Sequence, residues 1–412
     1  MSRAANKLLS KMFFNLLSAF SGRTDGDDEI FEAPHDYEEK IMELAGLKRE
    51  LDYKIYDVDL PKCQGHIHTL EAGFENPEVL VLVHGYAACG VFYYKVIKEL
   101  RDRFHIFAID MFGMGASSRP RMTNFTFDKV VEFFVAPLEE WRQKMNLQSF
   151  VLMGHSMGGY VCSQYYKLVP NSGIKMLYLL SPAGFTNKTD DEIANSPPPR
   201  RPGQKAEDPP KPRPSAVTSF FRFAFDLLSE KKLSPFSVAP FGIKHTMSRY
   251  FSGERLKLKE EEAEVFTELF ACTASQRLSG EKALGILLRY ARYSTKPICN
   301  ILKDLKQQGK LKVPVKVMYG IYDWMDSEHA ATMNESLGLN LPIEIIPDCD
   351  HQIIYQNPQG IANILLADLE KGYDQLAGQF SQEQTISRLP SITPSNGGGH
   401  GGDLRNRSPG LA

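Results

Sequence analysis

The sequence predicts an α/β fold in which a mostly parallel central sheet is flanked by helices and carries an inserted helical cap. Apolar, β-branched runs alternate with helical patterns from about 53 to 185 and again from 311, as expected where helical crossovers join parallel strands. The segment between these blocks is rich in proline and then in apolar helical patterns, which indicates an insertion. Residues 150–160 join a strand to a helix through a sharp turn.

The first core strand is predicted at Val79–Val83, where consecutive apolar β-formers indicate burial on both faces. It ends in the turn His84-Gly85. A further strand at Phe104–Asp110 runs into Gly113-Met114-Gly115-Ala116-Ser117. The glycine spacing differs from G-x-G-x-x-G, and no acidic residue ends a following strand where dinucleotide binding needs one. The loop is therefore interpreted as a tight crossing near the site.

The turn Gly154-His155-Ser156-Met157-Gly158 follows the apolar run Phe150–Met153 and opens a helix. A G-x-S-x-G between a strand and a helix is typical of a nucleophile elbow. Glycines are expected on both sides because a Cβ there would clash with the neighbouring strand or helix. The motif predicts Ser156 as a catalytic nucleophile.

A serine nucleophile needs a base and an acid that orients the base. The strand Val315–Gly320 precedes a loop with Asp323, which we predict as the acid; Asp326 is a rival that better fits the N-cap of the helix Ser327–Leu337. His351 follows the predicted strand Ile343–Pro347 and is the predicted base. The order Ser, Asp, His matches the order that accompanies such elbows.

The oxyanion hole is predicted from two backbone N–H groups. One belongs to Met157, the residue after the nucleophile, and the other to Tyr86, in the loop after the first core strand. We expect His84 to brace this loop by hydrogen bonding rather than to react.

These motifs resemble the α/β-hydrolase superfamily. Within it, His84-Gly85-Tyr86-Ala87-Ala88, Ser181-Pro182-Ala183-Gly184-Phe185 and Asp323-Trp324-Met325-Asp326 are similar to the α/β-hydrolase domain proteins numbered four and five. The resemblance covers roughly 50–186 and 311–372. It implies an α/β-hydrolase fold and hydrolysis or transfer of fatty acyl groups on lysophospholipids and related glycerolipids. No cofactor is implied, and acyl-CoA would serve only as co-substrate if transfer occurs.

Comparison with two branches of this group keeps alternative functions open. Some members are similar to lysophosphatidate acyltransferases and carry H-x-x-x-x-D from the triad histidine, whereas this chain has Gln356 at the last position. Another branch lacks the serine and acts as a lipase coactivator, whereas Ser156 is present here. A lipid-binding coactivator, or a small-molecule esterase or peptidase, stays open. Dehalogenase and epoxide hydrolase chemistry is disfavoured because those relatives place Asp at the elbow.

Composition fits one large core. The chain has 412 residues, 42% of them hydrophobic, and a formal net charge of −2, which gives no reason to expect nucleic acid as a partner. Its 6 cysteines are scattered without C-x-x-C spacing, and no His/Cys motif suggests a metal. Free thiols in a reducing compartment are the expectation, since no convincing secretory signal is present.

Five segments are predicted along the chain. The cap is expected to cover the serine and to bind the acyl chain, and its helices are predicted at Glu260–Cys272 and Lys282–Tyr293. The segments are an amphipathic N-terminal segment 1–24, a first core part 25–186, a helical cap 187–310 with a disordered proline-rich insert 196–214, a second core part 311–376, and a disordered tail 377–412.

The N-terminal segment has apolar residues at helical spacing, basic residues, and no acidic residue before Asp25. It is too short and too interrupted to span a bilayer. Two interpretations compete: a cytoplasmic protein held peripherally at a membrane or lipid droplet, or a mitochondrial transit peptide. The first is favoured because a lipid enzyme must reach a substrate held in a bilayer.

Overall fold

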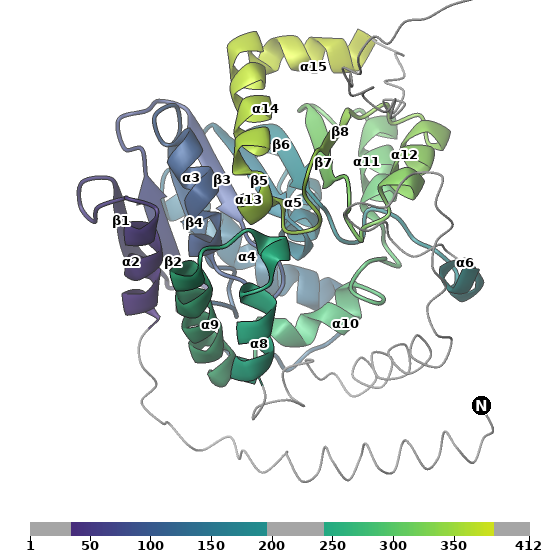
Figure 1. Cartoon of the computed structure of the whole chain (residues 1–412). Helices are drawn as coiled ribbons and strands as arrows, with labels where there is room; N and C mark the ends of the chain where they lie inside the picture. The colour runs from purple at the N-terminus through teal and green to yellow at the C-terminus, as the bar shows by residue number, and fades with distance from the viewer. Residues whose placement is uncertain (1–33, 196–242, 383–412) are drawn as a thin grey trace, which may run out of the picture.

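The computed structural model describes residues 34–195 and 243–382 (Figure 1). At its centre is an eight-stranded sheet in the order β1-β2-β4-β3-β5-β6-β7-β8. The strands are β1 (Tyr53–Leu60), β2 (Gly65–Ala72), β3 (Val79–Val83), β4 (His105–Ile109), β5 (Phe150–His155), β6 (Ile174–Leu180), β7 (Val315–Gly320) and β8 (Ile343–Ile346).

The sheet is parallel from β4 through β3 to β8, and the predicted fold class is confirmed. The predicted alternation of strands and helices from about residue 53 does not hold at one edge of the sheet. There β1 and β2 form an antiparallel hairpin, and β2 pairs antiparallel with β4. The hairpin needs no crossover helix because Gln64, with φ of 54°, closes a short turn.

Helices cover both faces of the sheet. Alternate residues of β3 point in opposite directions, so that Leu80 and Leu82 contribute to one apolar core and Val81 and Val83 to the other. The Leu80 side is covered by α2 (His35–Leu44), α3 (Tyr94–Leu100) and α14 (Pro358–Lys371), and the Val81 side by α4 (Phe127–Lys144), α5 (Met157–Leu168) and α11 (Ile298–Gln307).

The insertion between β6 and β7 contains further helices, of which α8, α9 and α10 lie below the sheet in Figure 1 and α6 lies to the right. They are α6 (Asp190–Asn195), α8 (Ile243–Phe251), η3 (Glu254–Leu256), α9 (Glu260–Ser275), η4 (Gly280–Ala283) and α10 (Leu284–Leu287). The helix predicted at Glu260–Cys272 is confirmed as α9. The continuous helix predicted at Lys282–Tyr293 is wrong, because Tyr290 and Ala291 adopt positive φ angles of 53° and 55° that a helix does not accommodate.

The predicted cap boundary at 310 also differs from the structure. The helix α11 lies within the predicted cap but packs on α5 and the sheet, with Ile298, Ile301, Leu302 and Leu305 buried. Its amphipathic pattern places these residues on one face, and that face meets the core rather than the active site. The remaining core helices are α12 (Ser327–Ser336), α13 (Ile353–Gln356) and α15 (Tyr373–Gln382).

Several predicted segments lie outside the described residues, namely the N-terminal segment 1–24 and the proline-rich insert 196–214. The tail predicted to begin at 377 begins instead with the end of helix α15, and its remainder from 383 lies outside the described residues. Within 34–195 and 243–382, no helix is long and apolar enough to cross a membrane.

Candidate active site

Ser156 lies at the apex of the turn between β5 and α5, with φ of 54° and ψ of −119°. This left-handed backbone is strained for a residue with a side chain and is retained only where the surroundings enforce it. The two flanking glycines show the enforcement. A Cβ on Gly154 would lie 2.6 Å from the Gly158 carbonyl, and a Cβ on Gly158 would lie 2.3 Å from the His84 carbonyl oxygen.

The structure brings together the three side chains predicted for the triad. The Ser156 hydroxyl lies 3.0 Å from Nε2 of His351, and Nδ1 of His351 lies 3.1 Å from Oδ1 of Asp323. Asp323 follows β7 and His351 follows β8, so the parallel strands deliver both loops to the same edge of the sheet as the serine. The arrangement is a continuous hydrogen-bonded chain from hydroxyl to imidazole to carboxylate.

The rival acid takes a different role. Asp326 caps α12 by accepting the N–H of His329 at 3.1 Å, and its carboxylate binds Nζ of Lys188 at 2.7 Å. Its assignment as an N-cap is confirmed. Two carboxylates three positions apart are therefore distinguished by their partners, since only Asp323 contacts His351.

Asp323 is well suited to remain ionised although its side chain is only 1% exposed. Burial by itself would raise its pKa, but the neighbouring His351 and the Met325 N–H, which donates to Oδ1 at 2.9 Å, hold the pKa of this carboxyl below its usual range. A buried carboxylate beside the imidazole stabilises the positive charge that the ring gains when it takes a proton. The ring of Trp324 packs against His351 at 4.9 Å between ring centroids.

Two other histidines lie at this edge of the sheet and serve as braces. His84 donates from Nδ1 to the Gly85 carbonyl at 2.7 Å and accepts the Met111 N–H on Nε2 at 2.8 Å, so the predicted bracing role is confirmed. His155 donates from Nε2 to the His351 carbonyl at 2.8 Å. Burial lowers the pKa of His84 to about 4 and that of His155 to about 3, which keeps both rings neutral.

The loop that follows β3 lies directly against the nucleophile. A Cβ built on Gly85 would lie 3.2 Å from Cβ of Ser156, a tight contact that glycine avoids. Met157 is the first residue of α5, and the N–H groups of a first helical turn have no partner inside their own helix. The structure thus places Tyr86 and Met157 on the two backbone segments that flank Ser156.

The cap holds the loop that carries His351, which sequence reasoning missed. Tyr250 accepts a hydrogen bond from Nε2 of Gln352 at 2.9 Å, and Arg255 forms an ion pair with Asp350. Lys257 donates to the Asp348 carbonyl at 2.9 Å. The three groups that they bind lie within three positions of His351, and the three cap residues all come from the segment 250–257.

Gln356 joins the same two segments. Its Oε1 accepts the Asp350 N–H at 2.6 Å, and its Nε2 donates to the Arg255 carbonyl at 2.6 Å. An aspartate at this position is shorter and has no N–H to donate. The departure from H-x-x-x-x-D therefore gives this chain an amide that bonds both the histidine loop and the cap.

A second part of the cap holds the loop after β3. The Tyr86 hydroxyl donates to the Glu281 carbonyl at 3.2 Å, and the Glu281 carboxylate binds Arg119 at 2.9 Å. The N–H of Gly280 donates to the Gly113 carbonyl at 2.9 Å, which confirms that the glycine-rich loop lies near the site. Two cap segments thus clamp the two loops on either side of the serine.

Comparison with known proteins shows which family this chain matches. The family described as alpha/beta hydrolase fold matches residues 78–358. The chain is 29% identical over 306 residues to the 1-acylglycerol-3-phosphate O-acyltransferase of Arabidopsis thaliana, over 73% of this chain and 68% of that protein. It is 26% identical over 274 residues to the (lyso)-N-acylphosphatidylethanolamine lipase of Mus musculus, over 66% and 72%.

Among solved structures, the naproxen esterase of Bacillus subtilis superposes with a TM-score of 0.55 at 14% identity, over 81% of this chain and 96% of that one. A likeness at this identity shows a shared fold alone. With the elbow, the strand order and the family match together, the resemblance predicted from the motifs is confirmed. The chain belongs to the α/β-hydrolase family, in the group similar to the α/β-hydrolase domain proteins four and five.

Proposed function

We propose that this protein is a serine hydrolase that cleaves acyl esters or amides of lipids through an acyl-serine intermediate. The observation that carries the proposal is the chain of contacts Ser156, His351 and Asp323, at 3.0 Å and 3.1 Å, on a strained elbow. The substrate class, lysophospholipids and related glycerolipids, is supported by relatives named for lipid acyl transfer and lipase activity.

In the first half-reaction, Nε2 of His351 takes the hydroxyl proton as Oγ of Ser156 attacks the acyl carbonyl carbon. The carbonyl π electrons move onto oxygen, and the backbone N–H groups of Met157 and Tyr86 stabilise that oxyanion. Each such donor contributes about 3 kcal/mol to lowering the barrier. The imidazolium then protonates the departing alcohol or amine, and the acyl group remains on Ser156 as an ester.

In the second half-reaction, His351 takes a proton from water, and the resulting attack releases the fatty acid and restores the serine. An acyl acceptor in place of water gives transfer by the same residues, with acyl-CoA as one donor. Relatives named as acyltransferases make transfer the second candidate. Gln356 bears on the choice between hydrolysis and transfer, because the acyltransferase-like motif has a carboxylate at this position. In this chain the Gln356 amide instead bonds both the cap and the loop that carries His351.

A third candidate is a lipid-binding coactivator that keeps the serine without turnover. The hydrogen-bond contact between Ser156 and His351 favours catalysis over this role.

For the N-terminal segment 1–24 we propose attachment to a membrane or lipid droplet, with a mitochondrial address as the alternative. Its support is the amphipathic, basic pattern of the sequence.

The test uses the purified full chain, a fluorophosphonate probe and a panel of lysophospholipids and N-acyl lipids, with and without acyl-CoA. We expect labelling and fatty acid release that vanish in Ser156→Ala. The matched control is Ser163→Ala, a buried serine of α5 whose hydroxyl donates to the Gly159 carbonyl of its own helix. Equal turnover by Ser156→Ala and the parent would refute the proposal, and turnover only with acyl-CoA would assign transfer.

A further inference from the structure

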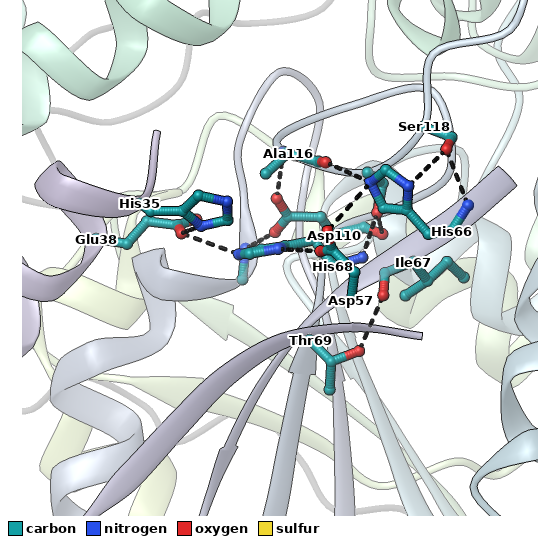
Figure 2. A network of polar contacts seen from close by, with 12 residues as sticks. His35, Glu38, Asp57, His66, Ile67, His68, Thr69, Asp110, Ala116 and Ser118 are labelled. Carbon is teal, nitrogen blue, oxygen red and sulfur yellow. Dashed lines mark hydrogen bonds and ion pairs between the residues drawn. The ribbon is translucent and has the colours of Figure 1, made fainter. Parts of the chain in front are cut away.

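A polar cluster joins helix α2 to the β1–β2 hairpin, away from the residues of the elbow, as Figure 2 shows for its members His35, Glu38, Asp57 and His68. At its centre is His68 of β2, whose side chain is 3% exposed. Its Nδ1 donates to Oδ1 of Asp57 at 2.7 Å, and its Nε2 lies 2.9 Å from Oε2 of Glu38 on α2. Nδ1 of His35 lies 3.6 Å from the same Glu38 oxygen.

We propose that His35, Glu38 and His68 form a binding site for a divalent transition metal ion, with zinc the best match. One ligand atom from each residue lies within 4.8 Å of the other two. With zinc bonds of about 2.0–2.1 Å in a tetrahedron, neighbouring ligand atoms are roughly 3.3 Å apart. The two separations at Glu38, 2.9 Å and 3.6 Å, bracket that value, and the ligand atoms of the two histidines lie within 4.8 Å of each other, so side-chain shifts can bring all three onto one ion.

The histidine is already oriented as a metal ligand. Asp57 and His68 are direct partners across the β1–β2 register, so the hairpin itself holds the carboxylate on Nδ1. A carboxylate that accepts the second ring N–H is the usual outer partner of a metal-bound histidine. His35 and Glu38 lie three positions apart in the first turn of α2 and therefore share one face of the helix.

The charge of the cluster favours a cation. Glu38 and Asp110 bring two buried carboxyl groups to the cluster, and Asp57 adds a third whose side chain is 42% exposed. Buried carboxylates without compensation are costly. A divalent ion bound to Nε2 of His68 adds positive charge to the cluster, while Nδ1 still donates to Asp57.

The ligand types select the ion. Two imidazoles and one carboxylate form a set typical of zinc rather than of calcium or magnesium, which prefer oxygen ligands. Glu38 also belongs to a second group, with Cys89 and Asp110, that is buried throughout. We assign the ion to the histidine group because the side chain of His35 is 45% exposed and gives solvent access. The ion would fix the start of α2 to the sheet, a structural role independent of the acyl chemistry.

The test begins with the full chain stripped by a chelator and reloaded with zinc or cobalt. We expect one equivalent of zinc to survive gel filtration in elemental analysis, and the unfolding temperature to rise until one equivalent is added. The cobalt form should show the visible absorption bands of a tetrahedral site. A parent chain that retains no zinc and gains no thermal stability would overturn the proposal and leave a purely proton-held cluster.

Variants locate the site. His35→Ala removes one ligand and leaves the contact between His68 and Glu38 intact, so the stripped variant should fold as the parent does but bind zinc at least about tenfold more weakly. Asp57→Asn removes the outer carboxylate and should weaken zinc binding by about 10–100-fold. The control is His329→Ala on α12, whose ring contacts the Asn187 carbonyl. Parent-like zinc affinity in His35→Ala would refute the assignment.

Discussion

Two buried histidines of this protein each donate from Nδ1 to a carboxylate, but their second ring nitrogens meet different partners. Nε2 of His351 faces the Ser156 hydroxyl, and Nε2 of His68 faces the Glu38 carboxylate. Burial by itself would lower the pKa of His68, but Glu38 and Asp57 outweigh it and raise the pKa to about 11. A ring between two carboxylates holds its proton or a metal ion, whereas a ring beside a hydroxyl can pass a proton on.

The two rings also differ in what supports them. His68 lies on a strand, and the register of the hairpin places Asp57 opposite it. His351 lies on a loop between β8 and α13, and its position depends on contacts from the cap, including Gln356 to Arg255. The same carboxylate–imidazole pair is therefore fixed by regular structure in one region and by an insertion in the other.

Removing the general base, His351, should have the largest effect on kcat. His351→Gln keeps a polar side chain of similar size but cannot act as base, so kcat should fall by about 10⁴-fold or more while the unfolding temperature stays near that of the parent. Initial rates on the preferred lysolipid, with circular dichroism as a folding check, measure this. A variant with more than a tenth of the parent activity would show that His351 is not the base.

The next test replaces Asp323, the carboxylate that accepts from Nδ1 of His351. Asp323→Asn should lower kcat by about 10⁴-fold, because the amide no longer stabilises the imidazolium or fixes its tautomer. Asp326→Asn is the matched control, as it changes a carboxylate that caps α12 and binds Lys188. Its kcat should change by less than about tenfold. Equal losses in the two variants would contradict the assignment of Asp323.

Replacing His68, which is held between two carboxylates, should lower the free energy of unfolding. His68→Gln removes the partner of the buried Glu38, and removal of one partner from a buried ion pair costs about 3–5 kcal/mol of unfolding free energy. The pair with Asp57, whose side chain is 42% exposed, contributes less. Chemical denaturation of the metal-free chain measures this loss. His66→Gln is a suitable comparison, since its side chain is 32% exposed, and it should cost less. A loss below that of His66→Gln would mean that the buried ion pairs contribute no net stability.

Loosening the support of the catalytic loop should have the smallest effect. Gln356→Ala leaves the Asp350 N–H and the Arg255 carbonyl without this partner, at a cost of about 1–3 kcal/mol. We expect a fall in kcat of roughly tenfold with KM little changed, because the loop that carries His351 becomes less well ordered. Gln359→Ala, an exposed residue of α14, is the control and should leave kcat unchanged. A parent-like kcat in Gln356→Ala would show that this amide does not support His351.

Local sequence patterns predicted much of this architecture. The run Val79–Val83 requires burial on both faces, and Gly154 and Gly158 permit the sharp turn that presents Ser156 to His351. Asp323 and His351 could be placed because each follows a strand of a parallel sheet, whose ends meet at one edge. The β1–β2 hairpin and the break at Tyr290 and Ala291 were missed, since short turns with positive φ leave little trace in apolar periodicity.

The sequence by itself determined the family, the strands that carry the site, and the three residues whose side chains meet. Only the tertiary structure decided how the cap holds the loops and how His35, Glu38 and His68 converge. Periodicity records which face of each element is apolar, because that pattern is a property of each element alone. Which polar groups meet inside depends on the packing of elements far apart in the chain, and a polar residue has the same identity whether it meets water or another side chain.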